Sequence, residues 1–136
     1  MRYFIQLSFI FLSFTIAAQS PIGTWKTIDD TSGNTRSYVD IYEQDGMLFG
    51  KISKLLDHNP DALCKLCSGK KKNTPIVGLV IIEKMNPNKE VWEGGKILDP
   101  ETGKEYDCEL WLEDGNLKVK GKHWTGFSQT QTWYSL

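Results

Sequence analysis

Two cysteines three positions apart, Cys64 and Cys67, are the residues whose spacing most directly suggests chemistry. In an oxidising compartment such a pair most simply forms a local disulfide, which would close the irregular segment that carries it. The third cysteine, Cys108, could instead bond to either of them, which would tie that segment to a strand and leave one thiol free. We expect the Cys64–Cys67 disulfide, with Cys108 on the apolar face of its strand as a small hydrophobic side chain.

The same thiols allow redox catalysis or zinc binding. Redox catalysis by Cys-x-x-Cys needs a thiolate stabilised by a helix N-terminus or by nearby cations. Lys65 lies between the two cysteines and three lysines follow them, but no strand–helix–strand pattern surrounds the pair. Zinc could take the three cysteines and His58 as ligands, although the spacing from Cys67 to Cys108 is not that of a known zinc motif. We therefore expect neither a metal nor a cofactor, and rank both alternatives below the disulfide.

Other catalytic patterns are missing from the sequence. It contains no Gly-x-Ser-x-Gly, no His-Glu-x-x-His and no phosphate-binding glycine loop, and two histidines are too few for a multi-histidine site. Glu105, Asp107 and Glu109 share one face of a predicted strand, opposite its apolar residues, which is typical of a solvated outer face. We expect no enzymatic activity.

Five tryptophans in 136 residues indicate either a packed core or an aromatic ligand pocket. Ligand pockets are mostly aromatic and aliphatic with a few polar groups, and the predicted strands offer both kinds of side chain. If the interior holds a cavity, we expect Val39, Ile41, Leu110 and Val119 in its wall. The predicted ligand-binding residues are Trp25, Arg36, Tyr38, Tyr106, Gln131 and Trp133.

The elements that must position these residues are strands. Alternating apolar and polar residues, separated by short turns rich in Gly, Pro, Asp and Asn, predict an antiparallel meander. The pairs Asp45-Gly46 and Asp114-Gly115 are strong hairpin signals. Eight strands are expected, near 23–29, 36–43, 47–53, 77–84, 91–98, 104–112, 117–122 and 129–135.

An all-β meander of this kind can protect its edges by closing into a barrel or by folding into a two-sheet sandwich. A sandwich needs long crossovers, and only the segment 55–75 could supply one. We therefore predict an eight-stranded antiparallel up-and-down barrel with one long loop or short helix at about 55–75. Within that segment we expect a helical turn from about Asp61 to Cys67, with Asn59 or Asp61 available as its cap. Such a barrel is either filled with side chains or holds one small ligand.

The first eighteen residues are typical of a secretory signal peptide. Arg2 precedes an apolar run from Phe4 to Ile16, and the small residues Ala17 and Ala18 follow. About 13 apolar positions span under about 20 Å as a helix, short of the roughly 30 Å needed to cross a bilayer. We expect cleavage after Ala18, export to the periplasm or cell exterior, and one domain over 19–136 without a stable membrane span.

The formal net charge of the chain is −1. A nucleic-acid partner requires a basic face, so none is expected. The short run Lys70–Lys72 stands beside Ser68 and Gly69, which is typical of a solvated loop tip. The oligomeric state stays open.

Gly23-Thr24-Trp25 on the first predicted strand resembles the opening of lipocalins and other calycin-type barrels, in which the tryptophan closes one barrel end. The mature chain resembles an uncharacterised family of exported bacterial proteins, a domain of unknown function with a lipocalin-like barrel. The residues that carry this resemblance are 23–25, 50–52, 94–100, 103–106, 110–119 and 130–133.

The chain departs from these patterns at three places, one of which is Tyr134-Ser135, where that family often has a basic residue after the tryptophan. That family commonly has Gly-Arg before Thr-Gln-Thr-Trp, where this sequence has Ser128-Gln129. Lipocalins place an arginine of the last strand against the first tryptophan, whereas no arginine follows Arg36 here. The resemblance implies a fold and an export route, and implies no reaction.

Three functions from different classes follow. The leading one is non-enzymatic binding of a small, partly apolar ligand inside the barrel. The alternative is a structural or protein-interaction module of the cell envelope, with a filled barrel that displays the 55–75 loop. A redox or zinc protein is the third. A cavity would favour the first, and a packed interior with an ordered apolar loop would favour the second.

Overall fold

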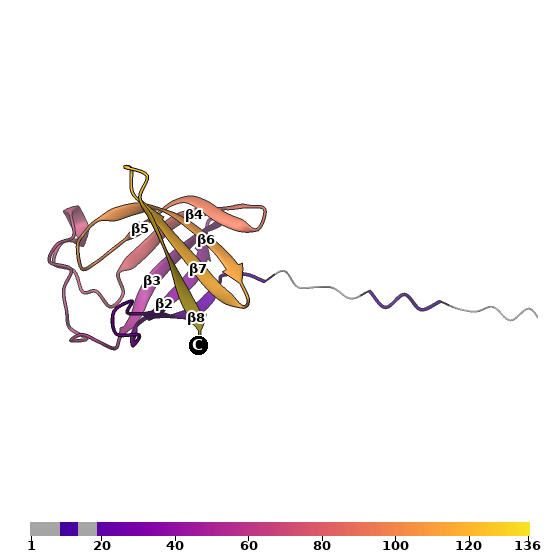
Figure 1. Cartoon of the computed structure of the whole chain (residues 1–136), viewed down its shortest axis with the longest axis horizontal. Coiled ribbons are helices and arrows are strands. Elements are labelled where there is room, and N and C mark those ends of the chain that lie inside the picture. The colour runs from indigo at the N-terminus through magenta and orange to yellow at the C-terminus, as the bar shows by residue number, and fades with distance from the viewer. Residues whose placement is uncertain (1–8, 14–18) are drawn as a thin grey trace, which may run out of the picture.

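The computed structural model describes residues 9–13 and 19–136, and residues 20–136 contain one closed barrel of eight antiparallel strands in chain order (Figure 1). The predicted signal peptide lies outside the described residues except for positions 9–13. The predicted all-β barrel is confirmed. Its strands are β1 (Gly23–Ile28), β2 (Thr35–Gln44), β3 (Met47–Leu55), β4 (Val80–Asn88), β5 (Val91–Leu98), β6 (Glu105–Glu113), β7 (Asn116–Lys122) and β8 (Ser128–Ser135).

One end of the barrel is made of two-residue turns. Asp45-Gly46 joins β2 to β3 and Asp114-Gly115 joins β6 to β7, and all four residues have φ between 53° and 78°. Positive φ at both positions is the geometry whose twist matches that of antiparallel strands, and Asp-Gly adopts it readily. The turn between β4 and β5 at positions 89–90 is equally short and lies at the right of Figure 1. We call this end the closed end.

The other end carries the long connections. Because neighbouring strands run in opposite directions, the connections 29–34, 56–79, 99–104 and 123–127 all leave the barrel at the end opposite the tight turns. In Figure 1 the 56–79 segment lies at the left and the 123–127 loop protrudes at the top. We call this end the open end.

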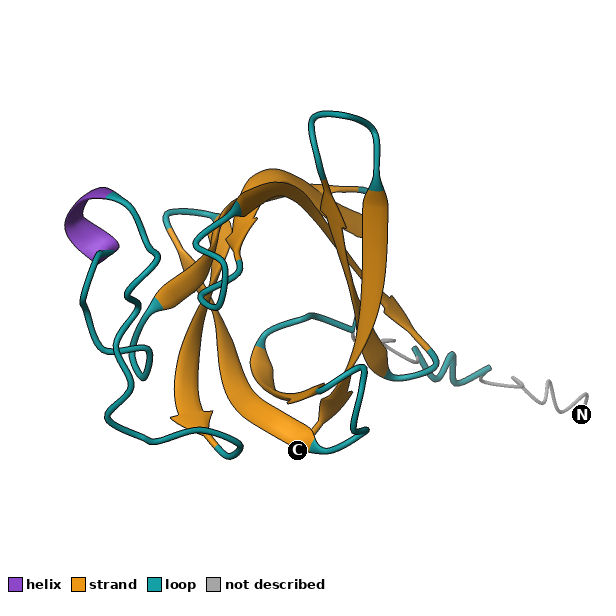
Figure 2. Cartoon of the chain, turned by 60° about the vertical axis from the view of Figure 1, so that its left-hand side comes forward, coloured by secondary structure: helices purple, strands orange, loops and turns teal. Residues whose placement is uncertain are grey.

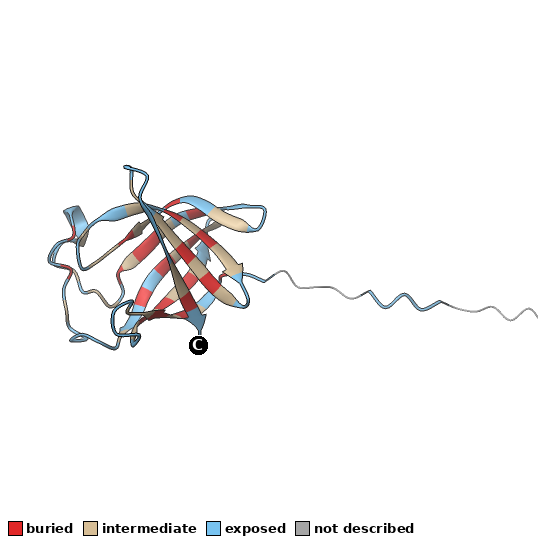
Figure 3. Ribbon diagram, viewed as in Figure 1, coloured by how far each residue is buried: buried red, intermediate tan, exposed pale blue. Residues whose placement is uncertain are grey.

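The closed end is filled by side chains. Burial alternates along the strands, with buried bands separated by intermediate or exposed ones (Figure 3). The indole Nε1 of Trp25 donates to the Pro21 carbonyl oxygen at 2.7 Å, which fixes this ring across the closed end. The buried residues of the closed half include Trp25, Leu48, Met85, Leu110, Leu117 and Trp133.

The barrel closes where β1 meets β8, and this seam is short. Only the pairs Trp25–Ser135 and Lys26–Tyr134 join the two strands, whereas six pairs join β7 to β8. Toward the open end the two strands separate, and the Gln129 side-chain amide donates to Asp30 Oδ2 at 3.3 Å across the gap. The seam therefore leaves one side of the open half without a continuous hydrogen-bonded wall.

The segment between β3 and β4 is a loop folded back on itself. Cys64 N–H donates to the Thr74 carbonyl and Asn73 N–H donates to the Cys64 carbonyl, both at 2.8 Å. This extended pairing is why the helical turn expected over 61–67 is wrong: those backbone groups bond across the loop rather than to their own turn. The loop's one helical turn is the 3₁₀ helix η1 (Gly69–Lys71), shown in purple in Figure 2.

Strand β4 also differs from its predicted range of 77–84. It begins at Val80 because Gly78, with a φ of 95°, turns the chain before the strand. It continues past Lys84 to Asn88, with Pro87 opposite Trp92. Among the described residues there is no helix with the length and apolar character that a bilayer span requires.

Candidate ligand-binding site

The open half of the barrel contains a cavity of about 440 Å³. Its wall comes from the open-end portions of β5 to β8, which the meander places side by side. One part of the lining is apolar or aromatic and the other is polar. The lining residues are Ile97, Asp99, Lys104, Tyr106, Val119, Gly121, His123, Thr125, Phe127, Gln129 and Gln131.

A smaller cavity of about 150 Å³ lies beside it, under the seam between β1 and β8. Thr27 and Trp133 line it from the two sides of the seam, and Ile52 and Ile81 line it from the opposite wall. Ile97, Asp99 and Gln131 line both cavities. The two cavities are therefore neighbours within one open half.

Two hydrogen-bonded pairs supply the polar groups nearest the core. The buried hydroxyls of Thr27 and Ser37 lie 2.7 Å apart and bond to each other. The indole Nε1 of Trp133 donates to Gln131 Oε1 at 3.0 Å. The first pair is self-contained, whereas the second leaves the amide nitrogen of Gln131 available.

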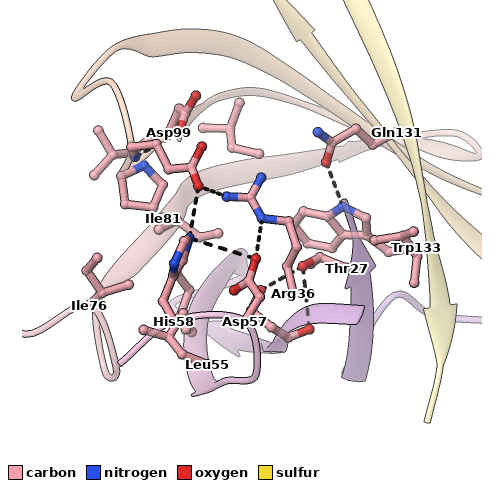
Figure 4. A pocket seen from close by; sticks show the side chains of 17 residues that line it. Thr27, Arg36, Leu55, Asp57, His58, Ile76, Ile81, Asp99, Gln131 and Trp133 are labelled. Carbon is pink, nitrogen blue, oxygen red and sulfur yellow. Dashed lines mark hydrogen bonds and ion pairs between the residues drawn. The ribbon is translucent and has the colours of Figure 1, made fainter. Parts of the chain in front are cut away.

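An ion-pair network stands at the mouth of the smaller cavity (Figure 4). The Arg36 guanidinium bonds to Asp57 Oδ2 at 3.3 Å and to Glu101 Oε1. His58 Nε2 lies 3.2 Å from Glu101 Oε1 and 3.8 Å from Asp57 Oδ2. These four side chains link the start of β2 to the 56–79 loop and to the turn after β5, so they hold three separate segments at the rim.

The predicted ligand-binding residues fall into two groups. Arg36, Gln131 and Trp133 line the smaller cavity, and Tyr106 and Gln131 line the larger one. Trp25 lines neither, because it closes the opposite end of the barrel. Whether the lining residues bind a ligand stays a prediction.

Tyr38 does not line either cavity. Neighbouring residues of a strand face opposite sides of the sheet, and Val39, fully buried, occupies the inner side. The Tyr38 ring instead faces outward, where Lys54 Nζ lies 5.8 Å from its centroid. Its proposed contact with an internal ligand is therefore not supported by its position.

Several lining residues were not among the predicted ones, notably His123, Phe127 and Gln129. His123 continues the inward-facing set of Val119 and Gly121, and Gln129 precedes Gln131 by two positions on β8. The period of two along a strand could have found both. Phe127 and the rim residues come from loops, for which no such periodicity exists.

The disulfide-closed part of the long loop packs against the barrel rim. Cys64 and Cys67 are bonded, with Cα atoms 5.4 Å apart, and both are buried. Cys64 Sγ lies 3.5 Å from the Pro100 carbonyl oxygen, and a side chain at Gly103 would overlap the Leu66 backbone. The loop and the turn after β5 therefore pack backbone to backbone at the mouth.

Cys108 is a free, buried thiol on the inner face of β6. Burial raises its pKa to about 12, with a smaller contribution from Glu109. At neutral pH it is protonated and unreactive. Within 9–13 and 19–136 no cluster of three or more His, Cys, Asp or Glu side chains could hold a metal ion.

Glu105, Asp107 and Glu109 lie on the outer side of β6. Asp107 pairs with Lys96 of the neighbouring strand; their contact lowers the pKa of the carboxyl and raises that of the ammonium. Both side chains are more than half exposed, so the pair contributes little to stability. The predicted solvated outer face agrees with this placement.

The sequence profile of a family described as "Uncharacterized protein conserved in bacteria (DUF2147)" matches residues 23–135. The chain belongs to this family. Among solved structures it is similar to protein HP1028 of Helicobacter pylori, which is described as belonging to the lipocalin family. The two share 22% sequence identity with a TM-score of 0.73, over 85% of this chain and 82% of that one. No curated protein shows significant similarity to the chain.

Proposed function

We propose that this protein is exported, is not an enzyme, and binds a small, partly apolar molecule at the open end of its barrel. The observation that carries the proposal is the cavity of about 440 Å³. Small-molecule sites usually measure about 300–1,000 Å³ and combine apolar walls with a few polar groups. Ile97, Val119 and Phe127 supply the apolar part here, and Gln129 and Gln131 supply polar groups.

Two further features support the proposal. An eight-stranded barrel has room for one small ligand when its interior is not filled, and the open half here contains two neighbouring cavities. A disulfide such as Cys64–Cys67 is typical of proteins in oxidising compartments, which agrees with export to the periplasm or cell exterior.

A protein-interaction module of the cell envelope is the second candidate. The observation that favours it is the apolar character of the long loop, where Leu63 and Leu66 are 42% and 63% exposed. The disulfide between the neighbouring cysteines fixes the backbone that presents them. In this function the barrel is a scaffold and the loop is the contact surface.

Native mass spectrometry of the protein purified from its own envelope distinguishes the two functions. Ligand binding predicts extra mass that is lost on denaturation. A bare chain, lighter than the sequence mass by the two hydrogens of one disulfide, would contradict it and favour the interaction module.

A cavity-filling variant with a matched control tests whether the extra mass sits in the larger cavity. The nearest atoms to a Cβ at Gly121 would be Tyr106 Cβ at 3.5 Å and Ile97 Cγ2 at 3.7 Å, which are ordinary contacts. Gly121→Leu therefore extends into the larger cavity, whereas Lys122→Leu adds the same side chain to the outer face. We expect the extra mass to persist in Lys122→Leu and to be lost in Gly121→Leu.

A further inference from the structure

The orientation of the Gln131 side-chain amide favours, in the larger cavity, a ligand that accepts a hydrogen bond. Trp133 Nε1–H can only donate, so the atom of Gln131 that faces it, at 3.0 Å, must be the carbonyl oxygen. Trp133 is 2% exposed and lies within the core, so this bond holds the amide in one orientation. Figure 4 shows the amide nitrogen of Gln131 directed away from the indole.

No hydrogen bond joins the nitrogen of that amide to another described residue, and the described residues contain no buried side-chain atom without a partner, so this nitrogen is accessible from the cavity side. Gln131 lines both cavities, so its NH₂ group is a pre-oriented donor in the open half of the barrel. A ligand that fills the site without accepting a hydrogen bond would leave this donor unpaired and desolvated, which is unfavourable. The site therefore selects for an acceptor oxygen.

The aromatic walls of the larger cavity favour a flat ligand. Tyr106, His123 and Phe127 contribute three rings, and the Tyr106 and His123 centroids lie 6.1 Å apart. Gly121 stands beside Tyr106 with no side chain, which leaves that part of the wall flat. Aromatic faces pack best against another flat π-system.

The charged residues of the lining do not favour a ligand of either charge. Lys104 and Asp99 both line the cavity, so one cation stands against one anion. Asp99 Oδ1 already accepts the Glu101 N–H at 2.9 Å. The preference for an oxygen acceptor thus comes from the amide and not from a net positive field.

We propose that the cavity binds a planar ring compound bearing a carbonyl-type oxygen, with that oxygen accepting a hydrogen bond from Gln131 Nε2 and the ring lying against Tyr106 and Phe127. This inference rests on the proposed function, since it names the ligand class of the same cavity. It makes Gln131 the residue that determines specificity and Trp133 the residue that positions it.

Three probes test the oxygen acceptor and the planar ring of the proposed ligand separately. Acetylnaphthalene carries the ring and a carbonyl oxygen, ethylnaphthalene has the same shape without the oxygen, and decanone carries the oxygen on a flexible chain. Dissociation constants come from quenching of tryptophan fluorescence. We expect acetylnaphthalene to bind about fivefold more tightly than ethylnaphthalene, the ratio that one net hydrogen bond supplies, and more tightly than decanone.

Gln131→Glu is the decisive variant, because one carboxylate oxygen can still accept from Trp133 while the other replaces the donor nitrogen with an acceptor. We expect it to remove the preference for acetylnaphthalene over ethylnaphthalene. Gln44→Glu makes the same change on an exposed residue at the closed end and should leave the preference intact.

The outcomes separate the two proposals. If the naphthalenes bind but Gln131→Glu keeps the wild-type preference, the assignment of Gln131 is overturned and ligand binding stands. If decanone binds as tightly as acetylnaphthalene, the planar-ring assignment is overturned. If no probe binds to the wild-type protein, the inference fails, and the mass spectrum of the envelope-purified protein decides separately whether ligand binding fails with it.

Discussion

Gly95 is the position where the barrel wall is most sensitive to one added carbon. A Cβ there would come within 2.5 Å of both the Glu83 carbonyl oxygen and Met85 Sδ. Ordinary non-bonded C···O separations are about 3.3 Å, so Gly95→Ala must push β5 away from β4 by about 1 Å. Met85 is fully buried and has little space into which to move.

The expected loss of stability in Gly95→Ala has two contributions. Overpacking a core costs about 1–3 kcal/mol, and weakening one hydrogen bond between the strands adds about 1 kcal/mol. In a domain of this size each kcal/mol lowers Tm by about 3 to 5 °C. We expect Gly95→Ala to lower Tm by about 10 °C in thermal unfolding followed by circular dichroism.

Gly50→Ala is the control for this prediction. Gly50 also lies within a strand, but a Cβ there meets side-chain atoms, Ile41 Cδ1 at 2.9 Å and Ile82 Cβ at 3.2 Å. The end of the Ile41 side chain can move where a carbonyl cannot, and Ile82 Cβ need move only slightly, so the loss should stay near about 1 kcal/mol, the low end of overpacking costs. Equal losses for the two variants, or a smaller loss for Gly95→Ala, would refute the backbone-overlap argument.

Three further predictions concern single groups. Because burial raises the pKa of Cys108 to about 12, iodoacetamide should leave this thiol unmodified at pH 8 until the protein unfolds; modification of the native protein, seen by mass spectrometry, would contradict this. Backbone N–H groups lower the pKa of Asp29, so its stabilising effect is complete above the unfolded value of 3.8 and is lost as the pH falls through the folded value. Asp29→Ala should therefore lower Tm at pH 7 and have a smaller effect at pH 2. Replacing Cys64 and Cys67 by serine removes a short cross-link worth about 2 kcal/mol, so Tm should fall by about 6 to 10 °C and trypsin should cut at Lys70–Lys72 faster; unchanged cleavage would show that the disulfide does not hold the loop.

The barrel could be predicted from the sequence because its turns are encoded locally. Asp45-Gly46 and Asp114-Gly115 need only their own backbone preferences to form hairpins, and both form where expected. Strand β4 was less predictable, since its start depends on Gly78 and its continuation through Pro87 depends on how β5 lies beside it. Short-range patterns therefore set the topology, and tertiary contacts set the strand ends.

The cavity lining was only partly predictable, because alternation along a strand identifies inward-facing residues but not contacts between distant segments. Alternation along β6 and β8 identifies Tyr106 and Gln131 as inward-facing, and applying the same rule to β2 would have excluded Tyr38. The ion-pair network at the rim joins Arg36, Asp57, His58 and Glu101. These residues lie on segments far apart in the sequence, and only the closed barrel brings them together.

The short seam between β1 and β8 has a consequence for how the chain can be rearranged. Trp25 lies opposite Ser135, so the first and last strands begin and end side by side at the closed end. A short peptide joining them would make the meander cyclic, and new termini could then open at any two-residue turn. Cutting at Asp45-Gly46 or Asp114-Gly115 would leave every open-end loop unbroken, so circular permutants should retain the cavity while folding from a different starting strand.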